Sequence, residues 1–321
     1  MLNIFMEIKN DLKVLERELQ RVVSDKDEFL SEIASYLLSA GGKRLRPAFA
    51  FLSARFYNYE IEKVLSLAVA LELIHMASLV HDDVVDAAAV RRGVPTVRSK
   101  WGNRVSMHIG DWIFAKSLIM ISQYKKIPIV ANTLSQISVK MCEGEIQQIS
   151  SVYKTDQTIK DYFYRIKRKT ALLIAASCQL GAVVCGAPET IHLPLKRFGY
   201  KIGIAFQIID DVLDLSADQR KLGKPIGGDL KQGIITLPMI YALKNSACKK
   251  RLSTIIQKHN KSEDEIQEAI DLIELLGGIE YANSVADRYV VKAKEELERL
   301  PDVPARDIMY KVADFVKHRK F

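Results

Sequence analysis

Apolar residues recur along most of this 321-residue chain at intervals of three and four, the spacing that places side chains on one side of a helix. The alternation of apolar and polar positions that is typical of strands is almost absent. The pattern therefore predicts an all-α protein. The expected helices cover residues 7–23, 25–39, 48–57, 61–86, 101–122, 128–149, 159–186, 195–215, 234–247, 263–275, 278–299 and 303–317.

Composition changes little along the chain. No low-complexity linker divides it, so we predict one domain over residues 1–321. Hydrophobic residues make up 48% of the sequence, which is ample for a buried core. No run of eighteen apolar residues is found, which argues against a membrane-spanning helix, and the N-terminus lacks the pattern of a signal peptide. We expect a cytoplasmic protein.

The net charge of +8 is compatible with nucleic acid, anionic membranes or phosphorylated small molecules as partners. The basic residues are mostly scattered and no motif that reads DNA or RNA is present, so we expect no nucleic acid partner. The four cysteines have neither CxxC pairs nor histidines at zinc-site spacing. Because all four lie in apolar stretches, we expect buried free thiols at Cys142, Cys178, Cys185 and Cys248.

Carboxylates interrupt two apolar helical patterns with the same spacing, as HDDVVD at 81–86 and as IDDVLD at 209–214. On a helix, Asp82 and Asp86 lie one turn apart on one face, where they repel each other unless a cation lies between them. Oxygen ligands without cysteine or histidine suit magnesium, which usually completes its coordination with phosphate oxygens. Two copies favour a magnesium-clamped diphosphate site, whereas either copy alone could be a solvated helix end.

Basic residues lie near these carboxylates in the sequence. The segment 41–47 reads GGKRLRP, whose glycines allow a tight turn that could present Lys43 and Arg46 to a polyanion. By itself, this segment could also be a solvated basic turn. Two adjacent arginines follow the first carboxylate cluster at 91–92. The glycines and lysines of 220–229 follow the second cluster, as a lid over phosphate would.

These motifs, in this order, carry a family likeness. The chain resembles the trans-isoprenyl (polyprenyl) diphosphate synthases over nearly all of its length, and within them it is most similar to the long-chain bacterial enzymes. The likeness rests on GGKRLRP at 41–47, LIHMASLVHDDVVD at 73–86 with RRG at 91–93, KT at 169–170, FQIIDDVLD at 206–214 and GKPIGGDLKQGIITLP at 223–238.

The resemblance implies an isoprenoid-synthase-type bundle of antiparallel helices around a deep central cavity. The two aspartate motifs are expected to face each other across its mouth. It also implies a homodimer. Some close relatives act only with a small non-catalytic subunit, so a heterodimer is the alternative assembly.

The resemblance also implies roles for individual residues. The catalytic set would be Asp82, Asp83, Asp86, Lys169, Asp210, Asp211 and Asp214. Three magnesium ions are expected: Asp82 and Asp86 would hold two, and Asp210 would hold the third, with Asp211 and Asp214 nearby. The residues that match contacts to the allylic diphosphate are Arg91, Lys169, Thr170, Gln207 and Lys224, and those that match the pocket for isopentenyl diphosphate are Lys43, Arg46, His75 and Arg92.

The implied reaction agrees with the residues. Diphosphate leaves a primary allylic carbon while magnesium and basic side chains neutralise its charge, and the double bond of isopentenyl diphosphate attacks the allylic cation. The proton is expected to pass to the departing diphosphate, since no convincing general base is present. His81 is expected in a satisfied polar contact, and His75 at phosphate.

Product length depends on the helix that carries Asp82. Positions on the same side of this helix are Leu71, Ile74, Ala77 and Ser78. In short-chain relatives, bulky aromatic residues near the last two positions block the cavity. The small Ala77 and Ser78 therefore favour a long product, about hexaprenyl to octaprenyl with heptaprenyl as the central expectation. The alternatives are that they only allow close helix packing, or that a geranylgeranyl product is made.

Such a product would supply a quinone side chain, such as that of menaquinone, and would be delivered to the membrane. Many relatives carry a lysine where this chain has Ile234, and Lys231 lies one helical turn earlier as a substitute. Two other functions compete with the synthase. A class I terpene cyclase shares an aspartate-rich helix, but needs no second diphosphate site. A non-catalytic subunit would be expected to have lost the motif residues.

Overall fold

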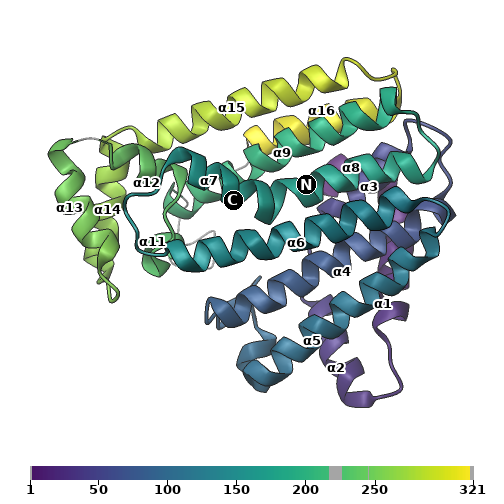
Figure 1. Ribbon diagram of the computed structural model, residues 1–321, viewed down its shortest axis with the longest axis horizontal. Helices are drawn as coiled ribbons and strands as arrows, with labels where there is room; N and C mark the ends of the chain where they lie inside the picture. The colour runs from purple at the N-terminus through teal and green to yellow at the C-terminus, as the bar shows by residue number, and fades with distance from the viewer. Residues whose placement is uncertain (1, 217–225, 245, 319–321) are drawn as a thin grey trace. The chain divides into compact units, whose positions relative to one another are not determined.

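The computed structural model describes residues 2–216, 226–244 and 246–318, and nearly all of its regular structure is helical (Figure 1). The all-α expectation is confirmed. The helices are α1 Lys9–Val23, α2 Glu28–Ser39, α3 Leu45–Ala54, α4 Ile61–Val85, α5 Val97–Ile121, α6 Pro128–Ser151, α7 Ile159–Ile166, α8 Leu172–Val184, α9 Glu189–Ser216, α11 Gly228–Gln232, α12 Leu237–Ala242, α13 Ser246–Gln257, α14 Glu263–Leu275, α15 Gly278–Leu297 and α16 Pro304–Lys317.

Short elements join some of these helices. They are the 3₁₀ turns η1 Leu2–Ile8 and η2 Ser122–Tyr124, the π turn η3 Lys167–Ala171, and the strands β1 Val90–Arg91 and β2 Val94–Pro95. The strands form one antiparallel hairpin in which Val90 pairs with Pro95 and Arg91 with Val94. The pattern of apolar residues did not predict this hairpin, because strands of two residues are too short to show an alternation.

The chain forms two compact units, each assembled from separate stretches. The first unit contains Met1–Gln136, Ala176–Lys196 and Leu300–Met309. The second unit contains Ile137–Ala175, Arg197–Arg299 and Tyr310–Phe321. The single domain expected from the sequence stays a prediction.

In the first unit, α4 and α5 run side by side, and α3 packs against α4 (Figure 1). Helix α4 is long and apolar enough to cross a membrane, the one such helix in the described part of the chain. However, 67% of its most apolar stretch is buried within the fold. It is therefore typical of the core helix of a globular protein, with its carboxylate-bearing end at the surface of that core.

In the second unit, α7 and α9 contribute to one apolar core together with α12, α14 and α15. The sequence predicts one helix over 159–186, but the chain forms α7, the π turn η3 and then α8. Two glycines let neighbouring backbones approach this turn: a Cβ on Gly144 would lie 2.9 Å from Cβ of Arg168, and one on Gly203 would lie 2.7 Å from Cα of Ala171. The extra backbone residue of a π turn is frequent at functional sites.

Other expectations need correction. Helix α13 was not predicted, and the expected helix over 234–247 is limited to α12, six residues long. Cys142 is exposed on α6 rather than buried, whereas Cys178 and Cys185 are buried as expected, and the side chain of Cys248 lies outside the described part of the chain. The apolar neighbours of Cys142 include Val139 and Ile146, which are themselves exposed, so apolar sequence at this place does not indicate burial.

Candidate active site

The first carboxylate cluster lies at the C-terminal end of α4. The helix ends at Val85, and Asp86 is its C-cap, with its backbone N–H donating to the carbonyl oxygen of Asp82 at 2.8 Å. Asp82 and Asp86 are partly buried, while Asp83 is buried. The two outer carboxylates of the motif are thus the more accessible ones.

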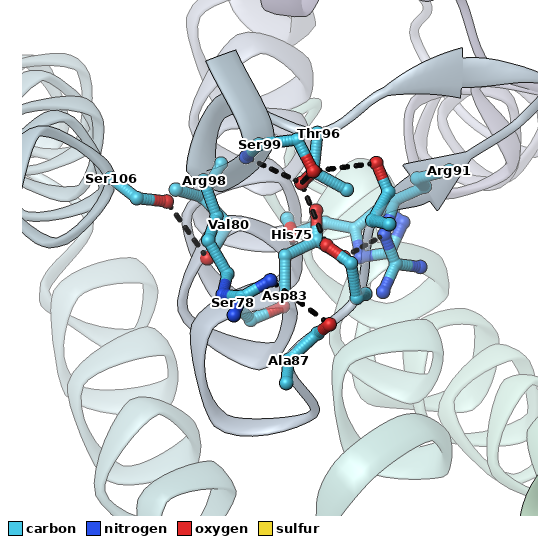
Figure 2. Close-up of polar contacts among 12 residues, drawn as sticks. His75, Ser78, Val80, Asp83, Ala87, Arg91, Thr96, Arg98, Ser99 and Ser106 are labelled. Atoms are coloured by element: carbon cyan, nitrogen blue, oxygen red, sulfur yellow. Dashed lines mark hydrogen bonds and ion pairs between the residues drawn. The ribbon is translucent and has the colours of Figure 1, made fainter. Parts of the chain in front are cut away.

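The inner carboxylate is used within the protein. Arg91 Nε donates to Asp83 Oδ1 at 2.6 Å, as Figure 2 shows, which joins strand β1 to the end of α4. The side chain of Asp83 is 7% exposed and that of Arg91 is 30% exposed. Asp83 therefore positions Arg91, a residue that the resemblance assigns to the allylic diphosphate.

The hairpin turn places a second arginine. Arg92 and Gly93 have φ angles of 53° and 80°, both in the left-handed region that a type I′ two-residue turn requires. Arginine rarely adopts this conformation, and such strain concentrates at functional sites. The guanidinium of Arg92 lies over Gly42: a Cβ there would be 2.7 Å from Arg92 Nη1. Gly42 is therefore needed for this close approach.

Hydrogen bonds from the start of α5 hold the segment that leads into and out of the hairpin (Figure 2). Thr96 Oγ1 donates to the carbonyl oxygen of Ala88 at 2.8 Å, and Ser99 Oγ donates to that of Ala89 at 2.8 Å. Arg98 Nη1 donates to the carbonyl oxygen of Ala87 at 3.0 Å. These contacts fix the place of the two arginines relative to α4.

Arg44, in the middle of the GGKRLRP segment, is buried. It forms ion pairs with Glu16, at 2.7 Å, and with Glu72, at 2.9 Å. Glu72 is 1% exposed and lies on α4. Arg44 is thus a structural cation that anchors the loop. The candidates for phosphate contact in this loop remain Lys43, which is exposed, and Arg46.

Arg46 and His75 lie in the same positively charged surroundings. Burial lowers the pKa of Arg46 to about 10, with Glu72 opposing and Arg92 adding to this effect. The Arg46 Nε is buried and has no hydrogen-bond partner among the described residues. Burial also lowers the pKa of His75 well below its ordinary value, and nearby arginines, first Arg46 and then Arg92, lower it further. The imidazole is therefore neutral.

His81 makes the polar contact that the sequence led us to expect. Its Nε2 lies 3.3 Å from the carbonyl oxygen of Met107 and 3.3 Å from Oδ1 of Asp111. A Cβ on Gly110 of α5 would lie 2.4 Å from His81 Nε2, so the glycine leaves the space that the imidazole ring occupies. His81 serves the packing of α4 on α5.

In the second unit, Asp211 on α9 accepts two hydrogen bonds. Tyr162 Oη donates to Oδ2 at 2.7 Å, and Gln207 Nε2 donates to Oδ1 at 2.9 Å. Thr170 Oγ1 in turn donates to Gln207 Oε1 at 2.7 Å. Burial raises the pKa of Asp211 to about 7, against the lowering effect of these two donors. Two of the five candidate contacts to the allylic diphosphate, Thr170 and Gln207, therefore belong to one hydrogen-bond network.

Asp214 holds the start of α11. Its Oδ1 accepts from the backbone N–H of Gly228 at 3.1 Å, and its Oδ2 accepts from that of Asp229 at 3.0 Å. Burial raises the pKa of Asp229 well above its ordinary value, and the charges of Asp214 and Asp211 raise it further. Asp229 was not among the site residues expected from the sequence, although it belongs to the family motif at 223–238.

Lys169 extends from the π turn to Glu145 on α6, with Nζ 2.9 Å from Oε1. Arg165, one turn earlier on α7, is 3% exposed. It donates to the carbonyl oxygen of Ile235 at 2.5 Å and to Gln157 Oε1 at 2.9 Å, and its charge lowers the pKa of both Asp211 and Asp229. Glu145 and Arg165 were also missed, since a lone charged residue in a helical pattern is usually solvated.

The product-length positions lie along α4. Leu71, Ile74 and Ala77 are buried, while Ser78 is partly buried and donates to the carbonyl oxygen of His75 at 2.8 Å. Lys224 and most of the expected lid, residues 220–225, lie outside the described residues. Lys231 is exposed on α11. That the two aspartate motifs face each other stays a prediction.

The donors at the two motifs are hard carboxylate oxygens, Asp82 with Asp86 on α4 and Asp210 with Asp214 on α9. Such donors suit magnesium. In the described part of the chain, no three His, Cys, Asp or Glu side chains gather closely enough to hold a metal ion by themselves. A cation bound at either pair would share its coordination with oxygens of a bound ligand.

Known proteins resemble this chain over almost all of its length. The heptaprenyl diphosphate synthase component 2 of Bacillus subtilis is 46% identical over 314 residues, which cover 98% of this chain and 89% of that protein. The crystal structure of heptaprenyl diphosphate synthase from Staphylococcus aureus has a TM-score of 0.92 and 36% identity, with 98% and 99% of the two chains covered.

A polyprenyl synthase from Caulobacter crescentus, solved with calcium and isoprenyl diphosphate, has a TM-score of 0.93 and 29% identity and covers 99% of this chain and 97% of its own. These structures confirm the helical fold that the resemblance implied. The polyprenyl synthetase family matches residues 27–273. On its fold, its motifs and this match, the chain belongs to the polyprenyl synthetase family and is a prenyltransferase.

Proposed function

We propose that this enzyme condenses isopentenyl diphosphate with an allylic diphosphate, farnesyl or geranylgeranyl, in successive trans head-to-tail steps. The product is a long-chain polyprenyl diphosphate of about hexaprenyl to octaprenyl length, with heptaprenyl as the central expectation. One observation carries the proposal. At the end of α4, Arg91 donates a hydrogen bond to Asp83 of the carboxylate motif, and the charges of Arg46, Arg91 and Arg92 all act on the neutral His75 of the same helix. Negatively charged substrates and a cation can both be bound there.

Magnesium is the proposed cofactor, with three ions per site. Asp82 and Asp86 would hold two of them, and Asp210 with Asp214 the third. The oxygen donors support a hard cation, and the relative solved with calcium and isoprenyl diphosphate supports a divalent one. When bound, the metal neutralises charge that develops on the departing diphosphate.

The basic residues have separate tasks in this proposal. Arg46, Arg92 and Lys43 hold the diphosphate of isopentenyl diphosphate, and the neutral His75 can donate a hydrogen bond to it without adding another charge. The allylic diphosphate is bound by Arg91, Lys169, Thr170, Gln207 and Lys224. These donors would stabilise the charge that develops on the leaving oxygen.

In this mechanism neither histidine near the first motif acts as the base for the proton. His81 is engaged with α5, and His75 is surrounded by arginines, which oppose the positive charge it would gain. We propose that the departing diphosphate takes the proton. The reaction therefore needs side chains that bind and orient rather than a side chain that titrates.

We further propose that the enzyme works as an assembly, either a homodimer or a complex with a small non-catalytic subunit. The Bacillus subtilis relative is named as one component of its synthase, which supports a second component here. Apolar side chains are exposed on α5 at Leu118 and Ile119, and on successive turns of α6 at Ile146 and Ile149. Exposed apolar patches of this kind are typical of protein interaction surfaces. A cytoplasmic enzyme of this kind would hand its product to the membrane for a quinone such as menaquinone.

The first experiment incubates the purified chain with magnesium, labelled isopentenyl diphosphate and farnesyl diphosphate, and separates the products by length. We expect a ladder that ends near heptaprenyl. If the chain alone is inactive, the assay is repeated with the candidate small subunit. An olefin without a diphosphate would instead identify a terpene cyclase, and no product in either assay would contradict the proposal.

The assembly is tested by light scattering on the purified chain, alone and mixed with that subunit. Replacing Leu118 and Ile119 with serine should shift either assembly toward the monomer while the circular dichroism spectrum stays unchanged. A monomeric wild type that remains fully active would contradict the proposed assembly.

A further inference from the structure

Tyr162 is a fully buried tyrosine that the mechanism above does not use. It lies on α7 at 0% exposure, within the apolar core of the second unit, and its neighbours in that core include Ile166 and Ile208. Buried tyrosine hydroxyls need a hydrogen-bond partner, and this one is Asp211, at 2.7 Å. A phenylalanine would pack equally well here. The hydroxyl therefore has a purpose beyond filling the core.

The direction of each hydrogen bond in this network can be assigned. In its ionised form the Asp211 carboxylate only accepts, and the Gln207 side chain turns its NH₂ group toward it, at 2.9 Å. The carbonyl oxygen of Gln207 then faces away from Asp211 and can only accept. Thr170 must therefore donate its hydroxyl proton to that oxygen, at 2.7 Å. The orientation of Gln207 and of the Thr170 hydroxyl follows from the position of Asp211.

Asp211 is held from two helices. Gln207 lies one turn earlier on α9, whereas Tyr162 comes from α7, 49 residues earlier in the chain. Arg165, one turn after Tyr162, lies with its guanidinium carbon 5.6 Å from the centre of the tyrosine ring and bonds to Ile235. Without the tyrosine hydroxyl, Asp211 would keep, among the described donors, the one on its own helix, so α7 would no longer fix the carboxylate.

We propose that Tyr162 is a positioning residue for the allylic diphosphate: through Asp211 it orients Gln207 and Thr170, and Asp211 acts as the link in this chain rather than as a metal ligand. The inference rests on the proposed function, which assigns Gln207 and Thr170 to that diphosphate. On this proposal the two aspartate motifs are organised in the same way. In each motif the middle aspartate, Asp83 or Asp211, positions a residue that binds diphosphate.

The test compares Tyr162→Phe with wild type in the full-length enzyme, together with the small subunit if activity needs it. We expect the KM for farnesyl diphosphate to rise about tenfold while the KM for isopentenyl diphosphate changes less than about twofold. Tyr124→Phe is the matched control. Its hydroxyl donates to the carbonyl oxygen of Lys63 and accepts from the N–H of Leu67, both at 2.8 Å, and neither partner is a candidate site residue.

A binding measurement separates this inference from the proposed function. Calorimetry with magnesium and inorganic diphosphate should show weaker binding for Tyr162→Phe than for Tyr124→Phe, whatever the turnover. If wild type makes no polyprenyl diphosphate, the proposed function fails. If wild type is active but Tyr162→Phe changes neither the farnesyl KM nor diphosphate binding, the positioning role fails.

Thr170, at the other end of this hydrogen-bond network, provides a second variant in case Tyr162→Phe does not fold. Thr170→Val removes the donor to Gln207 but leaves the tyrosine in the core. It should also raise the KM for farnesyl diphosphate. In the double variant this KM should rise by less than the product of the two single increases, since both substitutions act on one network. Equal effects on both KM values, or strictly independent effects in the double variant, would overturn the proposal.

Discussion

The Nε of Arg91 donates a hydrogen bond of 2.6 Å to Oδ1 of Asp83, eight residues earlier in the chain. This pair joins the β hairpin to the end of α4, and it separates the inner aspartate of the first motif from its outer neighbours, Asp82 and Asp86. A charge-assisted hydrogen bond to a buried carboxylate holds the guanidinium more firmly than a contact on the surface would. The motif thus combines two candidate metal-binding carboxylates with a third carboxylate that holds an arginine in place.

Asp83→Asn should weaken this anchor. We expect about a tenfold loss of kcat/KM for the allylic diphosphate, because Arg91 is no longer held by a charged partner. Arg91→Lys should cause a similar loss, and combining the two should add little further. A double-mutant cycle on kcat/KM measures this coupling. Independent, fully multiplying effects would show that the pair does not act as a unit.

Asp82→Asn and Asp210→Asn should each lower kcat by about 10²- to 10³-fold and raise the magnesium concentration needed for half-maximal activity. Removal of metal with EDTA should abolish activity, and magnesium should restore it. Asp271→Asn is the control, since Asp271 is exposed and accepts a hydrogen bond from Gln267. Activity that survives EDTA would contradict the proposed cofactor.

Glu72→Gln should destabilise the fold and weaken the binding of isopentenyl diphosphate. Glu72 is the buried partner of Arg44, and its charge also acts on Arg46 and Arg92. Removing one member of a buried ion pair costs about 3 kcal/mol of unfolding free energy. Urea denaturation measures the loss. Glu60→Gln, which breaks an exposed pair, should leave stability nearly unchanged. Equal stabilities of the two variants would contradict this role.

Because of His75, the free energy of unfolding should depend on pH. Burial and the charges of Arg46, Arg92, Arg91 and Arg44 hold its pKa in the folded protein below the unfolded value of about 6.5. Below that pH the unfolded chain binds one more proton, so the free energy of unfolding should fall as the pH decreases through this range. His75→Gln should remove this part of the dependence. Denaturation curves between about pH 5 and pH 8 test it, and identical slopes for both proteins would refute it.

Ala77→Phe should shorten the product, because a phenyl ring on this side of α4 would fill space that a growing chain needs. Ala77 is 2% exposed, so Ser78→Phe, at a partly buried position, is made as well in case the first variant does not fold. Ile74→Ala should act in the opposite direction and lengthen the product. Chromatography of the products tests all three. Unchanged lengths in folded, active variants would show that these residues only pack the helices.

The local sequence was enough to predict most helices and the two carboxylate motifs. Spacing on a helix depends only on the backbone, so the pairs Asp82 with Asp86 and Asp210 with Asp214 follow from the sequence alone. The turn at Gly41, with a φ of 70°, was likewise expected from the paired glycines. The hairpin and the π turn were missed, because each involves too few residues to produce a periodic pattern.

Tertiary structure decided what the individual side chains contact. Arg44 was one of three similar cations in a loop until packing buried it against Glu72, 28 residues later. Tyr162 had the pattern of an ordinary core residue until α9 brought Asp211 to its hydroxyl. A sequence shows which groups can ionise or donate, but whether a group is desolvated, and which partner compensates for it, depends on helices that meet only in the folded chain.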